Sequence, residues 1–320
     1  MNQKLDVNLI DRHLKALAQS KETIKTGIVY PCSADSLVGA LEAGRERIID
    51  PVLIGPKKRI LKLAENSGFN IESLEIIDIE SEAEASLKAV QMAAQGDVEA
   101  LMKGSLHTDE LMKEVVKSAN GLKTPRRISH VFVLADENYH KPFVITDAAI
   151  NIAPDLATKR DIVQNAVDFL CAISEFPTTP KVAVLAAVEV VNPAMNSTID
   201  AACLCKMADR GQIKGCIIDG PLAFDNAISK NAAQIKGIVS SVAGDADILL
   251  TPDLESGNML AKQLALLGNA SIAGVVLGAK VPIMLTSRAD NVESRVGSCM
   301  LAVLLAHAKR ENRLNYTKAV

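Results

Sequence analysis

Short β-rich runs alternate with longer amphipathic stretches along most of the chain, and this alternation constrains the fold more than any other feature. Parallel strands need a crossover between them, which is usually a helix. The alternation therefore predicts an α/β fold of three-layer α/β/α domains, with largely parallel sheets and helices on both faces. The predicted strands are residues 27–30, 51–54, 74–78, 98–102, 181–186, 215–218, 246–250, 272–277 and 282–286, and the later helices begin near Ser197, Ser229 and Ser256, where serine offers N-cap chemistry.

A segment with a different sequence pattern lies between the two series of predicted strands. Residues 128–134 and 142–145 are two strand-like runs joined by a polar segment, which predicts an antiparallel hairpin before a helix at 155–174. At roughly 150 residues per domain, a chain of 320 residues predicts two domains. We expect their boundary near Ala148. Without a Ser/Gly linker the domains should pack directly over a cleft, which is a favoured place for a ligand.

Composition excludes several classes of protein. A hydrophobic fraction of 48% with a net charge of −3 argues against disorder. The absence of net positive charge, with only 3% aromatic residues, argues against a nucleic-acid partner. No apolar stretch is long enough to predict a membrane span, and the N-terminus lacks the pattern of a signal peptide, so we expect a cytoplasmic protein. The six cysteines lack paired spacing, and we expect them to be reduced and mostly in the core.

Polar residues that follow predicted strands are the first candidates for a site, because ligands of parallel sheets bind at the carboxyl ends of the strands. Glu255-Ser256-Gly257-Asn258 at a helix start offers backbone N–H groups to an anion, although Ser256 alone is equally explained as a helix cap. Ser287-Arg288 offers a hydroxyl beside a planar cation. The alternative for Arg288 is an ion pair with Asp290. Further polar segments are residues 103–108, 146–147 and 219–226.

Familiar nucleotide, metal and nucleophile signatures are absent from the sequence. Lys103-Gly104-Ser105 is not a P-loop, and no Gly-x-Gly-x-x-Gly, His-Glu-x-x-His or Gly-x-Ser-x-Gly pattern occurs. His107 precedes Thr108 at a predicted helix start, which favours a structural role for it. Cys216 lies in an apolar run and Cys299 on a helix without an adjacent histidine, so neither is expected to be an activated nucleophile. We expect no metal site.

Taken together, the polar segments resemble the phosphate acyltransferase family that contains phosphate acetyltransferase and phosphate butyryltransferase. The resemblance extends from about Gly27 to the final helix, and the ordered set of motifs is far more specific than any one of them. The motifs are Met102-Lys103-Gly104-Ser105-Leu106-His107-Thr108, Thr146-Asp147-Ala148-Ala149-Ile150-Asn151, Ala187-Val188-Glu189-Val190-Val191-Asn192-Pro193, Asp219-Gly220-Pro221-Leu222-Ala223-Phe224-Asp225-Asn226-Ala227, Pro252-Asp253-Leu254-Glu255-Ser256-Gly257-Asn258 and Thr286-Ser287-Arg288-Ala289-Asp290.

The resemblance implies transfer of a short acyl group between coenzyme A and inorganic phosphate, which gives an acyl phosphate and free coenzyme A. It implies a homo-oligomer without a tightly bound cofactor, with coenzyme A as a substrate. The implied fold is like that of isocitrate and isopropylmalate dehydrogenases, with residues 1–148 plus 290–320 as the first domain and 149–289 as the second. Residues 187–193 and 286–290 look more like those of butyryltransferases, so butyryl is the expected acyl group and acetyl the alternative.

The resemblance also suggests which residues carry the reaction. We expect Ser287, Arg288 and Asp290 to be catalytic. Acetyltransferases of the family typically carry an aspartate seven positions after the motif serine as the base for the thiol, but this chain has Ser294 there. Asp290 is the candidate in its place, with Glu293 as an alternative. The expected substrate-binding residues are Lys103, Ser105, His107, Asp253, Ser256, Gly257 and Asn258.

Two other classes of function compete with acyl transfer. A dehydrogenase on the same fold would need a metal-binding carboxylate cluster and nucleotide contacts, which are not recognisable here. A non-catalytic protein that binds acyl-CoA or phosphate would bind its ligand but release no thiol. Attack of a coenzyme A thiolate on an acyl phosphate needs a phosphate site, donors for the carbonyl oxyanion and help in removing a proton, and the sequence can supply each of them.

Overall fold

The computed structural model describes residues 5–174, 178–287, 290–314 and 316. The chain forms two compact units. We call them the bipartite unit, which is built from Asp11–Pro125 and Ala273–Thr317, and the middle unit, which is built mainly from Arg126–Ile272. This division into compact units does not test the domain borders expected at residues 148 and 290, and those borders stay a proposal.

The strands of the bipartite unit lie in the order β3-β2-β1-β4-β11-β10. β1 runs parallel to β2 and β4, and β4 runs parallel to β11. β10 and β11 are antiparallel, because only a short turn and no helix joins them. This pair departs from the predicted strand–helix alternation. The elements of the unit are β1 (Ile24–Val29), α2 (Ala34–Arg45), β2 (Ile49–Gly55), α3 (Lys57–Asn66), β3 (Ile76–Asp78), α4 (Glu82–Gln95), β4 (Ala100–Lys103), α5 (Thr108–Val116), the 3-10 helix η1 (Ser118–Asn120), β10 (Ser271–Leu277), β11 (Ile283–Met284) and α11 (Val292–Arg310), while α1 (Val7–Gln19) enters it from residue 11.

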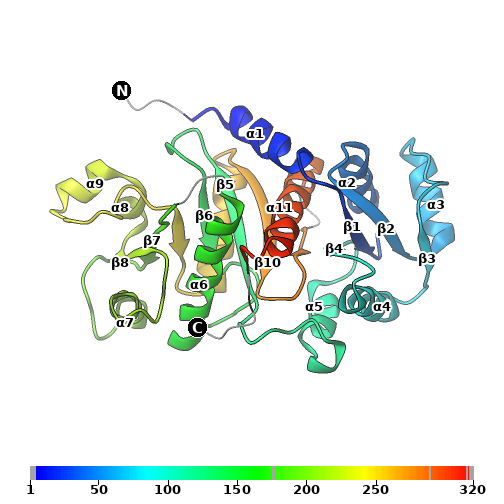
Figure 1. Cartoon of the computed structure of the whole chain (residues 1–320). Coiled ribbons are helices and arrows are strands. Elements are labelled where there is room, and N and C mark those ends of the chain that lie inside the picture. The colour runs from blue at the N-terminus through cyan, green and yellow to red at the C-terminus, as the bar shows by residue number, and fades with distance from the viewer. Residues whose placement is uncertain (1–4, 175–177, 288–289, 315, 317–320) are drawn as a thin grey trace. The chain divides into compact units, whose positions relative to one another are not determined.

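Helices α2, α3 and α11 share one hydrophobic cluster with the strands of the bipartite unit. The three-to-four-residue spacing of apolar side chains within residues 290–310 predicts a last helix. The structure places this helix from Val292 to Arg310, with Asn291 as the N-cap. In Figure 1, α2 and α3 lie above the strands of this unit and α4 and α5 lie below them. The arrangement matches the prediction of helices on both faces of a mainly parallel sheet.

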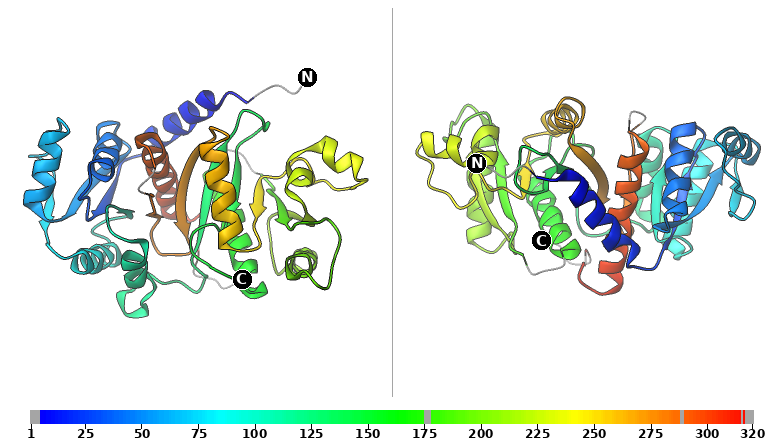
Figure 2. Two further views of the ribbon diagram at one scale, coloured as in Figure 1. Left: turned by 180° about the vertical axis from the view of Figure 1, so that it is seen from behind. Right: turned by 90° about the horizontal axis from the view of Figure 1, so that it is seen from above.

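The strands of the middle unit lie in the order β5-β6-β9-β7-β8. β5 and β6 form the predicted antiparallel hairpin, with Val131 opposite Thr146. The other pairs are parallel, and Figure 2 shows these strands and their helices from two further directions. The elements are β5 (Ser129–Ala135), β6 (Phe143–Thr146), α6 (Leu156–Ile173), β7 (Lys181–Leu185), α7 (Asn196–Asp209), β8 (Ile217–Leu222), α8 (Phe224–Ile228), α9 (Lys230–Ile235), β9 (Ile248–Leu250) and α10 (Leu254–Leu266).

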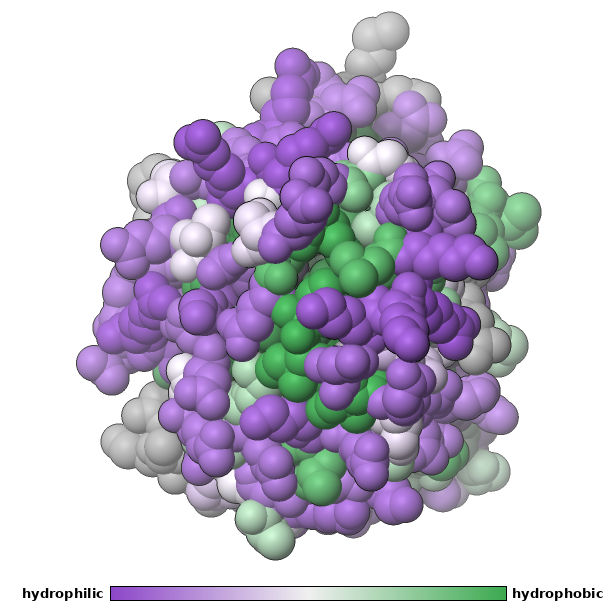
Figure 3. Space-filling model, turned by 90° about the vertical axis from the view of Figure 1, so that its right-hand side faces the viewer, coloured by the Kyte–Doolittle hydropathy of each residue, from purple (hydrophilic) through white to green (hydrophobic). Residues whose placement is uncertain are grey.

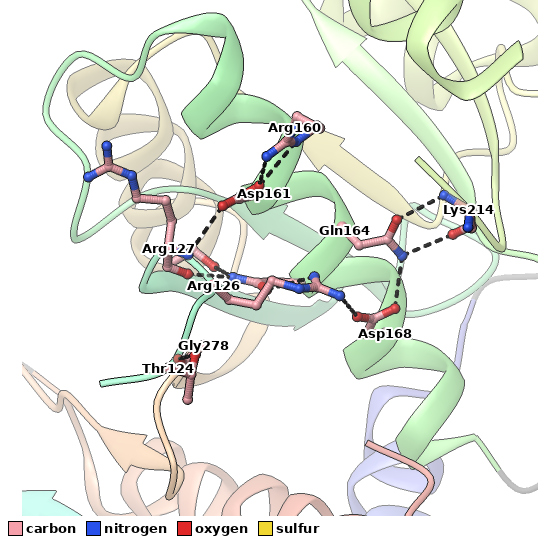
Figure 4. A network of polar contacts seen from close by, with 11 residues as sticks. Thr124, Arg126, Arg127, Arg160, Asp161, Gln164, Asp168, Lys214 and Gly278 are labelled. Carbon is pink, nitrogen blue, oxygen red and sulfur yellow. Dashed lines mark hydrogen bonds and ion pairs between the residues drawn. The ribbon is translucent and has the colours of Figure 1, made fainter. Parts of the chain in front are cut away.

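Helix α6 holds the beginning of the middle unit through buried polar side chains (Figure 4). Arg126 donates to Asn165 Oδ1 at 3.3 Å and to Asp168 Oδ2 at 3.0 Å. The backbone N–H of Arg127 donates to Asp161 Oδ2 at 3.3 Å. These bonds satisfy charged and polar groups that would be costly to bury without partners, so they anchor the chain where it enters the unit.

Figure 3 shows an apolar strip, bordered by polar side chains, on the face of the bipartite unit that lies toward α3 and β3. β3 is the outermost strand and pairs only with β2. It is three residues long and ends at the exposed Asp78. A short, charged edge strand discourages pairing with other chains. Within the described part of the chain, no helix is both long and apolar enough to span a membrane.

The prediction that the cysteines lie mostly in the core is wrong. Cys32 and Cys299 are buried, but Cys171 is exposed and the remaining three are half-buried. Cys171 lies on α6, close to its end, where the helix surface meets solvent. An apolar sequence context therefore did not separate a core position from a surface one.

His130 is a fully buried histidine of β5 and supports a prediction about acid stability. Neither ring nitrogen has a hydrogen-bond partner among the described residues, and burial lowers the pKa of His130 to about 3. The unfolded chain takes up a proton near the ordinary value of about 6.5, so stability is complete above that pH and falls as the pH drops toward 3. We expect His130→Phe to remove this dependence, which amounts to about 2 kcal/mol between pH 8 and pH 5. Urea unfolding at both pH values measures it, and an equal acid-induced loss in the two proteins would contradict it.

Candidate active site

Polar segments meet at one edge of the sheet in the bipartite unit, where β1, β4 and β11 end. These strands are parallel, so the residues that follow them leave the same edge. Thr286, after β11, donates its hydroxyl to the carbonyl oxygen of Lys103, at the end of β4, at 3.0 Å. The structure thus brings together the Lys103–Ser105 and Ser287–Asp290 segments that the sequence analysis singled out.

The Lys103 side chain turns back into its own loop. It is buried, and its Nζ donates to the carbonyl oxygens of Gly104 at 3.2 Å and Leu106 at 3.1 Å. Gly104 lies against the end of β1, because its N–H donates to Val29 O at 2.8 Å. A Cβ at Gly104 would lie 2.5 Å from the carbonyl oxygens of both Val29 and Tyr30. Only glycine allows this approach, so the loop conformation depends on it.

Ser105 contacts a residue that the sequence analysis did not single out. Its Oγ lies 3.1 Å from Ser36 Oγ, and Ser36 belongs to the capping box that begins α2 at Ser33. The hydroxyl of Ser105 is therefore held at the N-terminus of α2. The signal was available in principle, because Ser33 and Ser36 follow the first strand at capping-box spacing.

Asp290 makes two hydrogen bonds with Ser287, and we refer to these two bonded residues as the Ser287–Asp290 turn. Its Oδ2 accepts the backbone N–H of Ser287 at 2.6 Å, and its own N–H donates to Ser287 O at 3.3 Å. Ser287 is exposed and Asp290 half-buried. Arg288 lies outside the described residues, so its expected catalytic role and the alternative, an ion pair with Asp290, both stay predictions. The carboxylate is nevertheless held beside Ser287, as a proton acceptor near that hydroxyl would need to be.

Arg295 of α11 lies beneath this turn and was not predicted. It is only 2% exposed and donates to Thr286 Oγ1, Ser287 O and Asp290 O. Burial lowers the pKa of Arg295, while Asp290 and Asp35 raise it. Guanidinium groups stay charged under all ordinary conditions. A cation is thus present under the turn, and its sequence signal was an arginine on the apolar face of the last helix.

His107 occupies the N-cap position of α5, as its place before Thr108 predicted. The side chain is exposed and makes no capping bond to the helix. A purely structural role as a cap is therefore not observed. His107 remains a proposed substrate contact, four residues along the chain from Lys103.

In the middle unit, Asp147 stabilises the segment that follows β6. Its carboxylate accepts the N–H groups of Ala149 at 3.0 Å, Ile150 at 3.1 Å and Asn151 at 3.1 Å. Burial raises the pKa of Asp147, and these hydrogen bonds act in the opposite direction. The carboxylate is used within its own turn, which gives this motif a structural role.

Helix α10 begins at Leu254 with Asp253 as its N-cap, so the expected helix start at Ser256 is displaced by two residues. Asp253 Oδ1 accepts the N–H of Ser256 at 2.8 Å and its hydroxyl at 2.7 Å. The N–H of Gly257 donates to Asp253 O at 3.2 Å. The Asp253 carboxylate therefore already binds the N–H and hydroxyl of Ser256, and the Asp253 carbonyl binds the N–H of Gly257, although these donors were expected to bind an anion.

The next two residues pack against the segment after β6. A Cβ at Gly257 would lie 2.6 Å from Thr251 Oγ1. Asn258 Nδ2 donates to Ala148 O at 3.0 Å. The structure thus joins the predicted polar segments after β6 and β9, as expected for neighbouring parallel strands.

Neither a metal centre nor an activated thiol is found among the described residues. They contain no group of three or more His, Cys, Asp or Glu side chains arranged to hold a metal ion. Burial raises the pKa of Cys216 to about 11 and that of Cys299 to about 12. A thiol with so high a pKa is almost entirely protonated at neutral pH and is a poor nucleophile.

The sequence matches a protein-family model over a stretch that contains these polar segments. The model of the family described as phosphate acetyl/butaryl transferase matches residues 81–303, which include both polar segments of the bipartite unit and those of the middle unit. The match therefore covers well over half of the 320 residues.

Individual relatives carry two different names. A phosphate acetyltransferase of Rickettsia felis is 55% identical over 302 residues, which are 94% of this chain and 84% of that protein. A phosphate butyryltransferase of Clostridium acetobutylicum is 40% identical over 291 residues, 91% of this chain and 96% of that protein. The crystal structure of a branched-chain phosphotransacylase from Enterococcus faecalis matches with a TM-score of 0.77 and 32% identity, over 89% of this chain and 99% of that one. The mixed α/β architecture is shared with that structure.

Proposed function

Because the chain belongs to the phosphate acetyl/butyryl transferase family, we propose that it moves a short-chain acyl group between coenzyme A and inorganic phosphate, giving an acyl phosphate and free coenzyme A. It is an enzyme of the phosphate acyltransferase type. The observation that carries the proposal is the contact between the segments after β4 and β11, both of which lie within the family match.

The residues of the Ser287–Asp290 turn are proposed to carry the chemistry. Attack on the acyl carbonyl needs an anion-binding cation, a donor for the oxyanion and an acceptor for the thiol proton. We assign Arg288 to the phosphate, Ser287 to hydrogen bonding at the reacting centre and Asp290 to the proton. The bond from Ser287 N to Asp290 Oδ2 supports the last assignment, since it keeps the carboxylate beside Ser287.

Lys103, Ser105 and His107 are proposed substrate contacts in the bipartite unit. Ser105 is the best supported of them, because the Ser36 hydroxyl lies 3.1 Å from its own and orients it at the start of α2. Lys103 donates to two carbonyls of its loop, so its contribution is to shape the loop and to add positive potential.

Asp253, Ser256, Gly257 and Asn258 are proposed substrate contacts in the middle unit. Because Asp253 accepts the N–H of Ser256, a phosphate here would face a carboxylate of the same sign. That charge favours a neutral part of coenzyme A, such as its amide groups, over a phosphate at this helix start. The raised pKa values of Cys216 and Cys299 support direct transfer without an acyl-cysteine.

Butyryl and acetyl are the two candidate acyl groups, and different observations support each of them. Residues 187–193 and 286–290 resemble butyryltransferases, whereas the relative with 55% identity is named an acetyltransferase and the one with 40% a butyryltransferase. We propose a short-chain substrate in the range from acetyl to butyryl. A homo-oligomer and a dehydrogenase-like two-domain arrangement remain part of the proposal through the family resemblance.

Thiol release from a series of acyl-CoAs tests the proposal. Acetyl-, propionyl-, butyryl- and longer acyl-CoAs are supplied with and without phosphate, and free coenzyme A is measured. We expect release that requires phosphate, with kcat/KM highest for one of the two- to four-carbon acyl groups. Release without phosphate would indicate hydrolysis instead, and tight binding without release would indicate a non-catalytic binding protein.

A further inference from the structure

We propose that Arg295 is a positioning residue for acyl transfer: from beneath the Ser287–Asp290 turn, its guanidinium group holds the turn in the geometry that the reaction needs. The inference rests on the proposed function, because it assigns Arg295 to the same reaction. It adds a residue that makes no proposed contact with substrate and acts through Ser287 and Asp290.

The hydrogen bonds of Arg295 reach both ends of the turn. Nη2 donates to Ser287 O at 2.7 Å and Nε donates to Asp290 O at 3.3 Å. The donors of a guanidinium group lie in one rigid plane, so two such bonds fix the relative positions of their acceptors. Arg295 therefore sets how the backbone of Ser287 lies relative to that of Asp290.

A third bond extends this control to the loop after β4. Arg295 Nη1 donates to Thr286 Oγ1 at 2.6 Å, and that hydroxyl donates to Lys103 O at 3.0 Å. The Thr286 hydroxyl is thus an acceptor toward α11 and a donor toward β4. One buried side chain connects the two segments that carry the proposed chemistry of the bipartite unit.

Burying the charge of Arg295 costs free energy that a side chain serving only to pack would not need to spend. It is 2% exposed and lies on the face of α11 that also presents Val296 and Cys299 to the core. Among the described residues it forms no ion pair, and its acceptors are a hydroxyl and two carbonyl oxygens of the segment 286–290. An apolar side chain would bury here without desolvating a charge. The buried charge therefore serves to fix the geometry of the turn.

Helix α2 makes room for the arginine. A Cβ on Gly39 would lie 2.5 Å from Cδ and 3.0 Å from Cβ of Arg295. Glycine is unfavourable within a helix, and its presence here matches the space that the aliphatic part of Arg295 occupies. Gly39 of α2 thus leaves the space that the buried side chain of Arg295 fills.

The test compares Arg295→Lys, Arg295→Ala and Thr286→Val with the wild type, which must first show phosphate-dependent thiol release. Lysine keeps the charge but loses the planar fork, and valine removes the Thr286 hydroxyl at nearly unchanged shape. We expect kcat to fall by about 10- to 100-fold in all three, with the KM for acyl-CoA changed less than about threefold, because misplacement of reacting groups by about 1 Å can cost about 100-fold. Thermal unfolding reports whether each variant is folded.

Two controls separate positioning from folding. Thr286→Ser keeps the hydroxyl and should retain most of the wild-type kcat. Arg310→Gln removes an exposed arginine of the same helix, which pairs with Glu99, and should leave kcat unchanged. Added guanidinium ion should restore part of kcat to Arg295→Ala, whereas methylammonium should not.

Wild-type kcat in Arg295→Lys and Thr286→Val would overturn the inference, as would a loss of activity that only follows the unfolded fraction. If Arg295→Ala does not fold, the comparison of Thr286→Val with Thr286→Ser still decides it. A wild type without phosphate-dependent release would refute the proposed function itself, which is a different result from an active wild type whose variants are all active.

Discussion

Replacement of Arg288 by alanine is expected to lower kcat/KM for phosphate-dependent acyl transfer by about 100-fold or more, the size of effect that follows loss of a well-placed donor to a developing negative charge. A guanidinium group can bind phosphate oxygens through two parallel hydrogen bonds, which no neutral side chain replaces. We expect the KM for phosphate to rise together with the fall in kcat. Steady-state kinetics with phosphate varied at saturating acyl-CoA measure both.

Arg288→Lys is the matched variant, because it keeps the charge without the planar fork. Its activity should lie between those of the wild type and Arg288→Ala. Thermal unfolding of both variants should match that of the wild type within a few degrees. A wild-type KM for phosphate and a wild-type kcat in Arg288→Ala would remove this residue from the proposed mechanism.

Gly104→Ala is expected to destabilise the bipartite unit by about 3 kcal/mol, at the upper end of what overpacking costs. The new methyl group would lie 2.5 Å from two backbone carbonyl oxygens at the end of β1, and neither can move without disturbing the sheet. The loop that holds Lys103 and Ser105 must then shift, so activity should fall as well. Urea unfolding and the thiol-release assay measure the two effects.

Gly27→Ala is the control for this substitution. Gly27 lies on β1, but its nearest neighbours are the tips of Leu101 and Ile54, at 3.1 and 3.4 Å. These side chains can shift, so we expect a loss of no more than about 1 kcal/mol. Equal losses in Gly27→Ala and Gly104→Ala would show that contact with the carbonyl groups of β1 is not the cause.

Local pattern was sufficient for most elements of the fold. The hairpin of β5 and β6, the capped helix α6 and the long helix α11 are all predictable from alternation, turn composition and apolar spacing. The antiparallel pairing of β10 and β11 follows from the short connection between them, which the strand–helix alternation did not represent. The position of β11 beside β4 was not predictable, because β4 comes from the distant first part of the chain.

Two features of the site, the cap of α10 and the role of Arg295, were not predicted from the sequence, and each has a physical reason. Asp253 rather than Ser256 caps α10, and both residue types are good caps. The two lie three positions apart, so sequence preference alone does not choose between them. Arg295 was missed although it lies on the apolar face of the last helix, because a long arginine side chain at such a position can also extend its charged end to solvent. Its partners, Thr286 and the carbonyls of Ser287 and Asp290, become apparent only once the last helix packs under β11.

The bipartite unit takes β10, β11 and α11 from the last part of the chain, and this has a consequence for its synthesis on the ribosome. While the middle unit is being translated, β4 has no neighbour on one side, and the apolar surface that α11 later covers is open to solvent. The nascent chain therefore passes through a stage in which an unpaired strand edge and a bare core coexist, a state prone to aggregation. A ribosome pause near residue 273 would prolong that stage.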